Sequence, residues 1–253
     1  MPAEIKKIEF RNFRAVDHPE EALAFQNGHI DVLKNKGIIE SVDSTREEWL
    51  DNPSVYLMCL YHGKKMIGGA RVHAFNPAYE YPCIHAFQKK EGYYLDLSAY
   101  TGTYLHGEGC GIWATDEVMG LGMLEVVTYG AIAIAMSLGL DKVFGFGPRH
   151  TLGTFRRAGF EKISHEGKLI EFDYPSAKFR SAIVMCESRR DTYPFSREES
   201  RVFDWVDIPN FSYVQKGRSG DCLVQLSPFP TNDSIIEAHR GKKVIDHTVL
   251  LAV

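Results

Sequence analysis

The feature of this sequence that most constrains its fold is a glycine turn that leads directly into an apolar helix. Gly120-Leu-Gly122 follows a predicted strand at residues 110–115, and residues 123–138 are apolar on nearly every face. A helix of this kind is buried on all sides, and Glu125 and Thr128 within it argue against a membrane span. The glycines let the backbone turn tightly and gather N–H groups at the positive end of the helix dipole. The segment predicts a pyrophosphate site, although a purely structural turn has the same signature.

Strands are predicted to alternate with helices along most of the chain, which favours a mixed sheet with helices on both faces. The stretch between residues 73 and 107 is aromatic and too long for a hairpin loop, so we expect it to pack as a lobe or cover. The other predicted strands lie at residues 4–10, 55–61, 66–73, 142–146, 168–172 and 182–186, and the other predicted helices at residues 17–36, 44–50, 150–158 and 196–205.

The length of 253 residues suits one core with an appendage better than two full-sized domains. After residue 190 the pattern changes to turns and short apolar runs. We therefore expect a core at residues 1–190 and a C-terminal extension at residues 191–253 that packs on it.

Composition and motifs exclude several classes of protein. The formal net charge is −4 and no basic stripe exists, so nucleic-acid binding is not expected. No ligand set has zinc spacing, Gly-Lys-Ser/Thr is absent, and the glycine turn lacks the third glycine of a dinucleotide fingerprint. We therefore expect neither a metal nor a nucleotide cofactor of those kinds. Five unpatterned cysteines and an N-terminus without an apolar run favour a cytoplasmic protein with reduced thiols.

The order of motifs from residue 109 to residue 160 resembles the GNAT superfamily of N-acyltransferases. The donor-binding motif of that family, Gln/Arg-x-x-Gly-x-Gly/Ala, corresponds to Glu117-Val-Met-Gly120-Leu-Gly122, and Phe155-Arg-Arg-Ala-Gly159-Phe160 matches a later signature. The resemblance covers roughly residues 4–187. It implies an α/β (α+β) fold with a splayed mixed sheet and a donor that is acyl-CoA, acetyl-CoA or acyl carrier protein. The implied donor-binding residues are Trp113, Ala114, Val118, Gly120, Leu121, Gly122, Met123 and Phe155.

Two positions depart from the family pattern. Glu117 replaces Gln or Arg, and a carboxylate beside the phosphates repels them unless it points away or is paired. Arg149, Arg156 and Lys142 are the candidate partners. Phe155 stands where many relatives have a tyrosine that protonates the departing thiolate. A thiolate whose conjugate acid has a pKa near 8.5 leaves readily without that help.

A narrower resemblance points to autoinducer (acyl-homoserine-lactone) synthases and N-acyl amino acid synthases. Gly68-Gly-Ala-Arg71, then a long aromatic segment, then Gly111-Ile-Trp113 is similar to those families, which use the region to house an acyl chain. The autoinducer motif Trp-Glu-x-Ser-Arg is replaced by Trp113-Ala-Thr-Asp-Glu117, which argues against homoserine-lactone synthesis in particular.

The reaction implied by the resemblance is direct attack of an amine on a thioester. An alkylamine with a pKa near 10.4 is almost fully protonated at pH 7, so the site must supply a base, and a strand N–H near Trp113 and Ala114 is expected to polarise the carbonyl. Candidate bases are Glu108, His106 and Asp116, with Glu117 as a further choice, and candidate acceptor-binding residues are Arg71, Arg149 and His150. Each of these residues also has a purely structural interpretation as a loop, cap or surface side chain.

Several alternatives stay open. The acceptor is a small amine such as an amino acid, and the acyl chain is long or as short as acetyl. A non-catalytic thioester-binding module on the same fold is the competing hypothesis. The extension is expected to cover the acceptor site, dock a carrier protein, or form a homodimer through residues 249–253.

Overall fold

A computed structural model describes residues 5–38, 47–102 and 105–229. Strand β1 (Lys6–Arg14) is followed by a short 3-10 turn and by helix α1 (Pro19–Asn35), which has proline in its first turn as predicted. A 3-10 turn, η4 (Glu48–Asp51), precedes the antiparallel strands β2 (Val55–His62) and β3 (Lys65–Ala74). The aromatic lobe contains helices α2 (Pro82–Glu91) and α3 (Ser98–Thr101).

The second half of the chain contains the glycine turn and the elements around it. They are strand β4 (His106–Ala114), 3-10 turn η5 (Asp116–Val118), helix α4 (Met123–Ser137), strand β5 (Lys142–Pro148), helix α5 (Arg149–Arg157), strands β6 (Glu161–Lys162), β7 (Ser164–His165), β8 (Lys168–Leu169), β9 (Glu171–Asp173) and β10 (Arg180–Glu187), helix α6 (Val202–Asp207), and strands β11 (Ser212–Gln215) and β12 (Cys222–Leu226).

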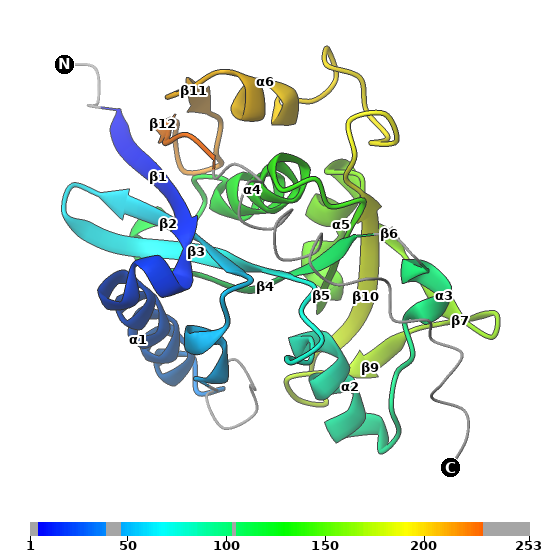
Figure 1. The fold of residues 1–253 in the computed structure, drawn as a ribbon. Coiled ribbons are helices and arrows are strands. Elements are labelled where there is room, and N and C mark those ends of the chain that lie inside the picture. The colour runs from blue at the N-terminus through cyan, green and yellow to red at the C-terminus, as the bar shows by residue number, and fades with distance from the viewer. Residues whose placement is uncertain (1–4, 39–46, 103–104, 230–253) are drawn as a thin grey trace.

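Among the described residues, ten strands form one mixed sheet, with the order β11-β12-β1-β2-β3-β4-β5-β10-β6 and with β9 beside β10. Helices α1 and α2 lie on one face of the sheet, and α4, α5 and α6 lie on the other (Figure 1). The predicted mixed α/β fold is confirmed. One predicted strand, residues 168–172, is split, because β8 pairs with β7 in a separate hairpin while β9 joins the main sheet.

Strand β4 begins four residues earlier than the sequence predicts. Gly107 and Gly109 carry no side chain that would signal a strand. The structure requires small residues there, since a Cβ on Gly107 would lie 2.8 Å from the His73 carbonyl oxygen and one on Gly109 would lie 3.3 Å from the Ala131 Cβ. Glu108 therefore lies inside β4 and not in a preceding loop.

Two irregularities of β4 shape the centre of the molecule. The strand pairs in parallel with β5 only from His106 to Gly109, and beyond that point the two strands separate. On its other edge, Gly111 and Ile112 together oppose the single residue Ala70 of β3, which makes a β-bulge. Gly111 has φ +60, a conformation that glycine adopts without strain.

The largest hydrophobic core lies between the sheet and α4, and it includes the buried aromatic residues Phe10 and Trp205. Aromatic residues of the lobe pack against β5, β9 and β10 in a second cluster. A third cluster, with Phe25, Trp49 and Trp113, lies beneath α1. Among the described residues, no helix has both the length and the apolar character needed to cross a membrane.

Residues 191–229 continue the main sheet. Strand β12 pairs in parallel with β1, and β11 pairs antiparallel with β12. Helix α6 packs on α4, where the ring of Trp205 lies 6.3 Å from Tyr129. The predicted helix at residues 196–205 is shorter and later than expected, since α6 begins at Val202 and a turn closed by Ser196 and Glu199 precedes it. Residues 249–253 lie outside the described residues.

Candidate acyl-transfer site

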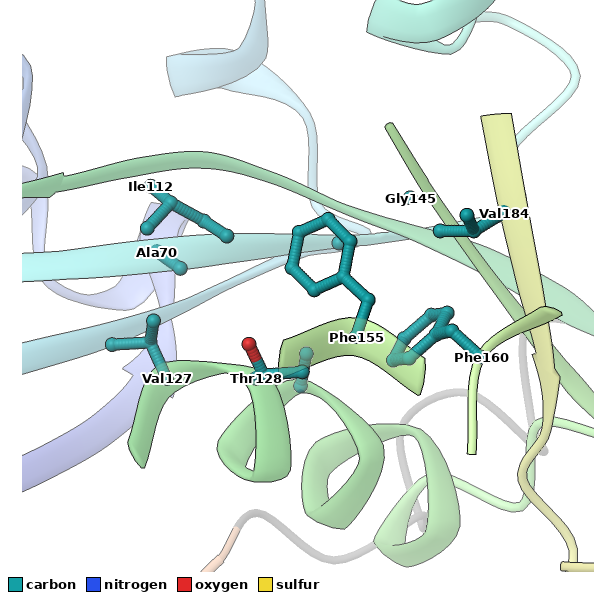
Figure 2. Close-up of a pocket in the computed structure, with 10 residues that line it drawn as sticks. Ala70, Ile112, Val127, Thr128, Gly145, Phe155, Phe160 and Val184 are labelled. Carbon is teal, nitrogen blue, oxygen red and sulfur yellow. The ribbon is translucent and has the colours of Figure 1, made fainter. Parts of the chain in front are cut away.

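An apolar cavity lies on the α4 face, where β4 and β5 separate. Its volume is about 20 Å³, and about 300 Å³ when the adjoining space that opens to solvent is included. The ring of Phe155 projects from α5 toward the sheet, among the other residues that line the cavity (Figure 2). The lining is small or apolar apart from one hydroxyl, and consists of Ala70, Gly109, Ile112, Val127, Thr128, Ala131, Gly145, Phe155, Phe160 and Val184. Such a cavity suits an apolar group.

A larger, polar cavity lies on the opposite face of the sheet, between η4, β3 and the start of α2. It holds about 870 Å³ of empty space, again partly open to solvent. Its lining includes ionisable and aromatic side chains: Glu48, Trp49, Asn52, Arg71, His73, Ala78, Tyr79, Glu80, Pro82 and His85.

The two cavities lie on opposite sides of β3, next to β4. Gly109 and Ile112 line the apolar cavity. Cys110 lies between them in the strand and opposes Arg71, which lines the polar cavity. The bulge makes this possible, because it places Ile112 on the α4 face while Trp113 packs beneath α1. Ala70 and Arg71 are neighbours in β3, so the two cavities approach each other across β3 and the adjoining residues 109–112 of β4.

Glu108 is a fully buried carboxyl group beside the polar cavity. It opposes His73 across the β3–β4 pair, and both of its oxygens accept the N–H of Cys83 at 3.1 Å, in the first turn of α2. Burial raises the pKa of Glu108 to about 7, against the lowering effects of that N–H and of Arg71. A carboxyl group whose pKa lies near the working pH is suited to accept a proton.

His106 lies at the start of β4, three residues before the strands separate. Its Nδ1 is 2.7 Å from the Tyr81 hydroxyl, and the ring of Phe75 lies 4.6 Å away. These contacts make it part of the packing between the lobe and the sheet. Three residues of extended strand span roughly 10 Å, so His106 is a weaker candidate base than Glu108.

Asp116 and Glu117 follow the far end of β4. Asp116 is exposed, and Glu117 is 2.5 Å from His62 Nδ1 and 3.1 Å from Lys65 Nζ. These contacts lower the pKa of Glu117, the His62 hydrogen bond first. The Glu117 carboxylate is therefore paired, and its partners are His62 and Lys65. The prediction that Arg149, Arg156 or Lys142 would pair with it is wrong. From Glu108 to Asp116 the chain extends on the order of 20 Å, so the two do not serve one site.

The glycine turn has the backbone expected of a tight strand-to-helix connection, with φ +79 at Gly120 and +80 at Gly122. A second turn, residues 216–221 between β11 and β12, packs directly on it. The Ser219 N–H donates to the Gly120 carbonyl oxygen at 3.1 Å, and a Cβ on Gly217 would lie 2.6 Å from the Leu121 Cα. Both turns contain paired glycines, but no pattern in the sequence links one turn to the other.

The other predicted donor-binding residues differ in which of their groups a ligand could contact. The side chains of Val118, Leu121 and Met123 are buried in the main core, which leaves only their backbone groups for a ligand. Trp113 packs on Phe25 at 5.6 Å, Ala114 ends β4, and Phe155 lines the apolar cavity.

Of the predicted acceptor-binding residues, the structure places only Arg71 in the polar cavity. Arg149 and His150 are exposed at the start of α5, where the Arg149 guanidinium is 3.7 Å from Glu171 and the His150 ring is 6.4 Å from Phe179. They begin α5, which follows β5 directly in the chain, and neither lines the polar cavity with Arg71.

Several residues of the polar cavity were not singled out from the sequence, among them Trp49, His73 and Tyr79. They lie far apart in the chain and form no motif, so only the register of β3 and the packing of η4 brings them together. All five cysteines are buried free thiols. Cys110 lies near Arg71, but burial raises its pKa to about 12, which argues against a nucleophilic role. Among the residues that can be described, no three His, Cys, Asp or Glu side chains gather as metal ligands would.

No protein-family model matches the sequence, and no curated protein sequence matches it. Solved structures do match the fold. BjaI, a CoA-dependent acyl-homoserine lactone synthase solved with SAM and isopentyl-CoA, has a TM-score of 0.56 at 14% identity, over 92% of this chain and 99% of that chain. FeeM, an N-acyl amino acid synthase from uncultured soil microbes, has a TM-score of 0.54 at 13% identity, over 80% and 99%.

A third solved structure, the acyl-homoserine lactone synthase LasI, has a TM-score of 0.52 at 12% identity, over 74% of this chain and 93% of that chain. At these identities the comparisons establish the architecture and leave the reaction to be argued from the site. The chain has the GNAT-type fold of acyl-homoserine lactone and N-acyl amino acid synthases, as its motifs predicted.

Proposed function

We propose that this protein transfers an acyl group from an acyl thioester to the amine of a small molecule. One observation carries the proposal: an apolar cavity and a polar cavity lie on opposite faces of the sheet, with the neighbouring β3 residues Ala70 and Arg71 in their respective linings, beside the point where β4 separates from β5. A thioester donor brings an apolar acyl group, and an amine brings a polar one. Beyond Gly109, β4 and β5 separate, and through this gap a reactant on one face can reach a reactant on the other face for direct attack.

The acyl group occupies the apolar cavity, with its carbonyl at the bulge formed by Gly111 and Ile112. A bulge leaves one residue of the longer strand without its ladder partner, so an N–H there is available to polarise the carbonyl oxygen. This places the polarising group one or two residues before the position expected from the sequence, near Trp113 and Ala114.

Glu108 takes the proton, directly or through a water molecule, as the amine nitrogen attacks the carbonyl carbon. The C–S bond then breaks and the thiolate departs, and a new C–N bond remains in the amide product. Phe155 has no proton to give, and the thiolate leaves without one because its conjugate acid has a pKa near 8.5.

The phosphates of a CoA or carrier-protein donor lie at the Gly120–Gly122 turn. The N–H groups in the first turn of α4 are the expected donors to an anion there. Pairing of Glu117 with His62 and Lys65 removes the repulsion that its sequence position suggested.

The test is release of CoA by the purified full chain, together with mass spectrometry of the acylated amine. Acetyl-CoA, octanoyl-CoA and an octanoyl carrier protein serve as donors, with a panel of small primary amines. Amine-dependent thiol release with a matching amide product supports the proposal. Donor binding without turnover for every amine would instead favour a thioester-binding module, and equal use of acetyl and octanoyl donors would favour short-chain transfer.

A further inference from the structure

Glu108, the proposed base, has no surface that a molecule in the polar cavity can touch. It is 0% exposed, and the first turn of α2 covers its side chain, where the Cys83 N–H donates to both carboxyl oxygens at 3.1 Å. A group buried to this extent is out of reach even for a molecule as small as water. A proton released in the cavity therefore needs an intermediate group, one that meets both the cavity and Glu108.

His73 meets both. It lines the polar cavity and is 5% exposed, and across the β3–β4 pair it lies directly opposite Glu108. Directly opposed residues project from the same face of a sheet, with Cβ atoms about 4.5–5.5 Å apart. An imidazole and a carboxyl group at these positions are within reach of each other. Hydrogen bonds between catalytic groups are often long before the substrate binds, and they shorten in the reactive complex.

The His73 ring is in the neutral form that a proton relay requires. Burial, and after it the charge of Arg71, lower the pKa of His73 well below its usual value. A neutral imidazole has an N–H at one nitrogen and a lone pair at the other, so it can accept a proton at one nitrogen and release a proton from the other. The Nε2 atom of His73 is buried and has no hydrogen-bond partner among the described residues, so no existing bond must break for the transfer.

The neighbouring groups are less suited to this role. The guanidinium of Arg71 has donors but no acceptor, so it cannot take up a proton. The Cys83 and Cys110 thiols are buried, and burial raises the pKa of both well above neutrality. The Nδ1 atom of His106 already contacts the Tyr81 hydroxyl at 2.7 Å.

We propose that His73 relays the proton of the attacking amine from the polar cavity to Glu108. The proposal rests on the proposed acyl transfer and adds a residue to its mechanism. As the C–N bond forms and the C–S bond breaks, the amine proton moves to the lone-pair nitrogen of His73, and the His73 N–H proton moves to the Glu108 carboxylate. His73 is then neutral in its other tautomer, and Glu108 is a neutral carboxylic acid. The reverse transfer delivers the proton to water in the cavity and restores both groups.

The first test measures amide formation from acetyl-CoA and octanoyl-CoA by H73N and H73Q. Both variants keep a polar side chain but lose the ability to take up and release protons, and circular dichroism checks that they fold. We expect kcat to fall by about 100-fold, with the donor KM unchanged. H165N, at an exposed histidine on β7, is the matched control and keeps wild-type turnover. Wild-type turnover by a folded His73 variant would overturn the relay and leave acyl transfer intact.

The pH dependence distinguishes a relay from a packing role. In the wild type, kcat/KM should rise with pH through about 7 as Glu108 loses its proton. If H73N cuts the route to Glu108, its residual activity should lack this step. A packing defect would lower activity at every pH and keep the step, and that result would overturn the relay.

Other ionisable groups face the same pair of residues, and E108Q serves as the blank for them, because any step that they cause persists in that variant. They are Glu48, Arg71, Tyr79, Glu80, Tyr81, Cys83, His85, His106 and Cys110.

A double variant tests whether His73 acts through Glu108. Residues of one proton pathway lose activity as a unit, so H73N combined with E108Q should have the same kcat as E108Q alone. Independent roles would multiply the two losses. A double variant whose loss equals the product of the separate losses would refute the relay.

A measurement without turnover separates the relay from the proposed function. The ¹⁵N chemical shifts of the His73 ring report which nitrogen bears the proton, and its signals are those that H73N lacks. We expect these shifts to change in the wild type as the pH passes about 7 and to stay constant in E108Q, because Glu108 ionises there. This coupling in a protein that forms no amide would sustain the proton-sharing pair and refute acyl transfer. Amide formation without the coupling would refute the relay alone.

Discussion

Where β4 and β5 separate, the two faces of the sheet differ in whether their buried polar atoms have hydrogen-bond partners. On the α4 face the lining is apolar, and its one hydroxyl, on Thr128, already donates to the Leu124 carbonyl oxygen at 2.6 Å. On the opposite face Arg71 and His73 keep buried polar atoms without partners, and Glu108 has a raised pKa. Apolar groups are buried without a partner at no cost, whereas polar groups are not. The α4 face therefore needs no ligand to satisfy its buried groups. The opposite face needs a polar molecule to supply partners for its buried polar atoms.

The largest expected effect is on the polar face, at Glu108. E108Q keeps the size of the side chain and removes the base, so kcat is expected to fall by about 10²–10⁴-fold. Donor binding should be unchanged, because the proposed donor site lies on the other face. In the wild type, kcat/KM should rise with pH through about 7, and in E108Q this step should disappear. E161Q, on the exposed strand β6, is the control. Normal turnover by E108Q would show that Glu108 is not the general base.

The same residue predicts that the polar face makes folding depend on pH near neutrality. The pKa of Glu108 is raised from 4.5 to about 7 by burial. Its contribution to stability is therefore fully present below pH 4.5 and is lost as the pH rises through about 7. At 1.36 kcal/mol per pKa unit, the loss amounts to about 3 kcal/mol.

Denaturant unfolding of the wild type and E108Q at pH 4.5 and pH 8 measures this loss. The contributions of the other titrating groups to the free energy of unfolding cancel when the wild type and E108Q are compared. The wild type should lose about 3 kcal/mol more than E108Q over the interval. Parallel pH profiles would mean that the Glu108 carboxyl group does not titrate in this range.

On the apolar face, the corresponding test reduces the volume of the apolar cavity by substitution of a residue in its lining. A Cβ on Gly145 would meet neighbouring atoms at 3.5–3.8 Å, which is ordinary contact, and Val suits a strand. G145V should therefore fold, and its added methyl groups should take space from a long acyl chain. We expect turnover of octanoyl-CoA to fall by about 100-fold, equivalent to about 2.7 kcal/mol, and turnover of acetyl-CoA to fall far less.

The helical position Gly153 offers a matched control, since a Cβ there approaches only Arg157 Nη1, at 3.8 Å. G153A should leave both donors unaffected. If G145V lowered octanoyl and acetyl turnover equally, the cavity on the α4 face would not hold the acyl chain.

The apolar face could be predicted from the sequence more completely than the polar face. The Gly120–Gly122 turn, α4, β5 and α5 are contiguous in the chain and carry strong local signals, so their order alone indicated the fold. Phe155 followed from its spacing to Gly159-Phe160. These features depend on local periodicity and turn chemistry, which a single sequence contains.

The polar face depends on contacts between distant segments, and these have no local signal. Trp49, Arg71 and Glu108 belong to η4, β3 and β4, and they meet only through strand register and the bulge at Gly111. The sequence analysis included Glu108 and Arg71 as candidates but could not choose between Glu108, His106 and Asp116. Burial and distance separate these residues, and both are tertiary properties.

The smallest expected effect concerns the turn at residues 216–221, which packs on the proposed phosphate site at Gly120–Gly122 and lines neither cavity. A Cβ on Gly217 would lie 2.4 Å from the Gly120 carbonyl oxygen, so G217V must push this turn away from the glycine turn. If the contact holds the phosphate-binding backbone in place, the donor KM should rise about tenfold, or about 1.4 kcal/mol. The rise should be the same for acetyl-CoA and octanoyl-CoA, because both carry the same phosphates, and the acceptor KM should not change. This independence of acyl length distinguishes G217V from G145V in one set of assays. A donor KM that stays at the wild-type value in a folded G217V protein would show that the contact between the two turns serves packing alone.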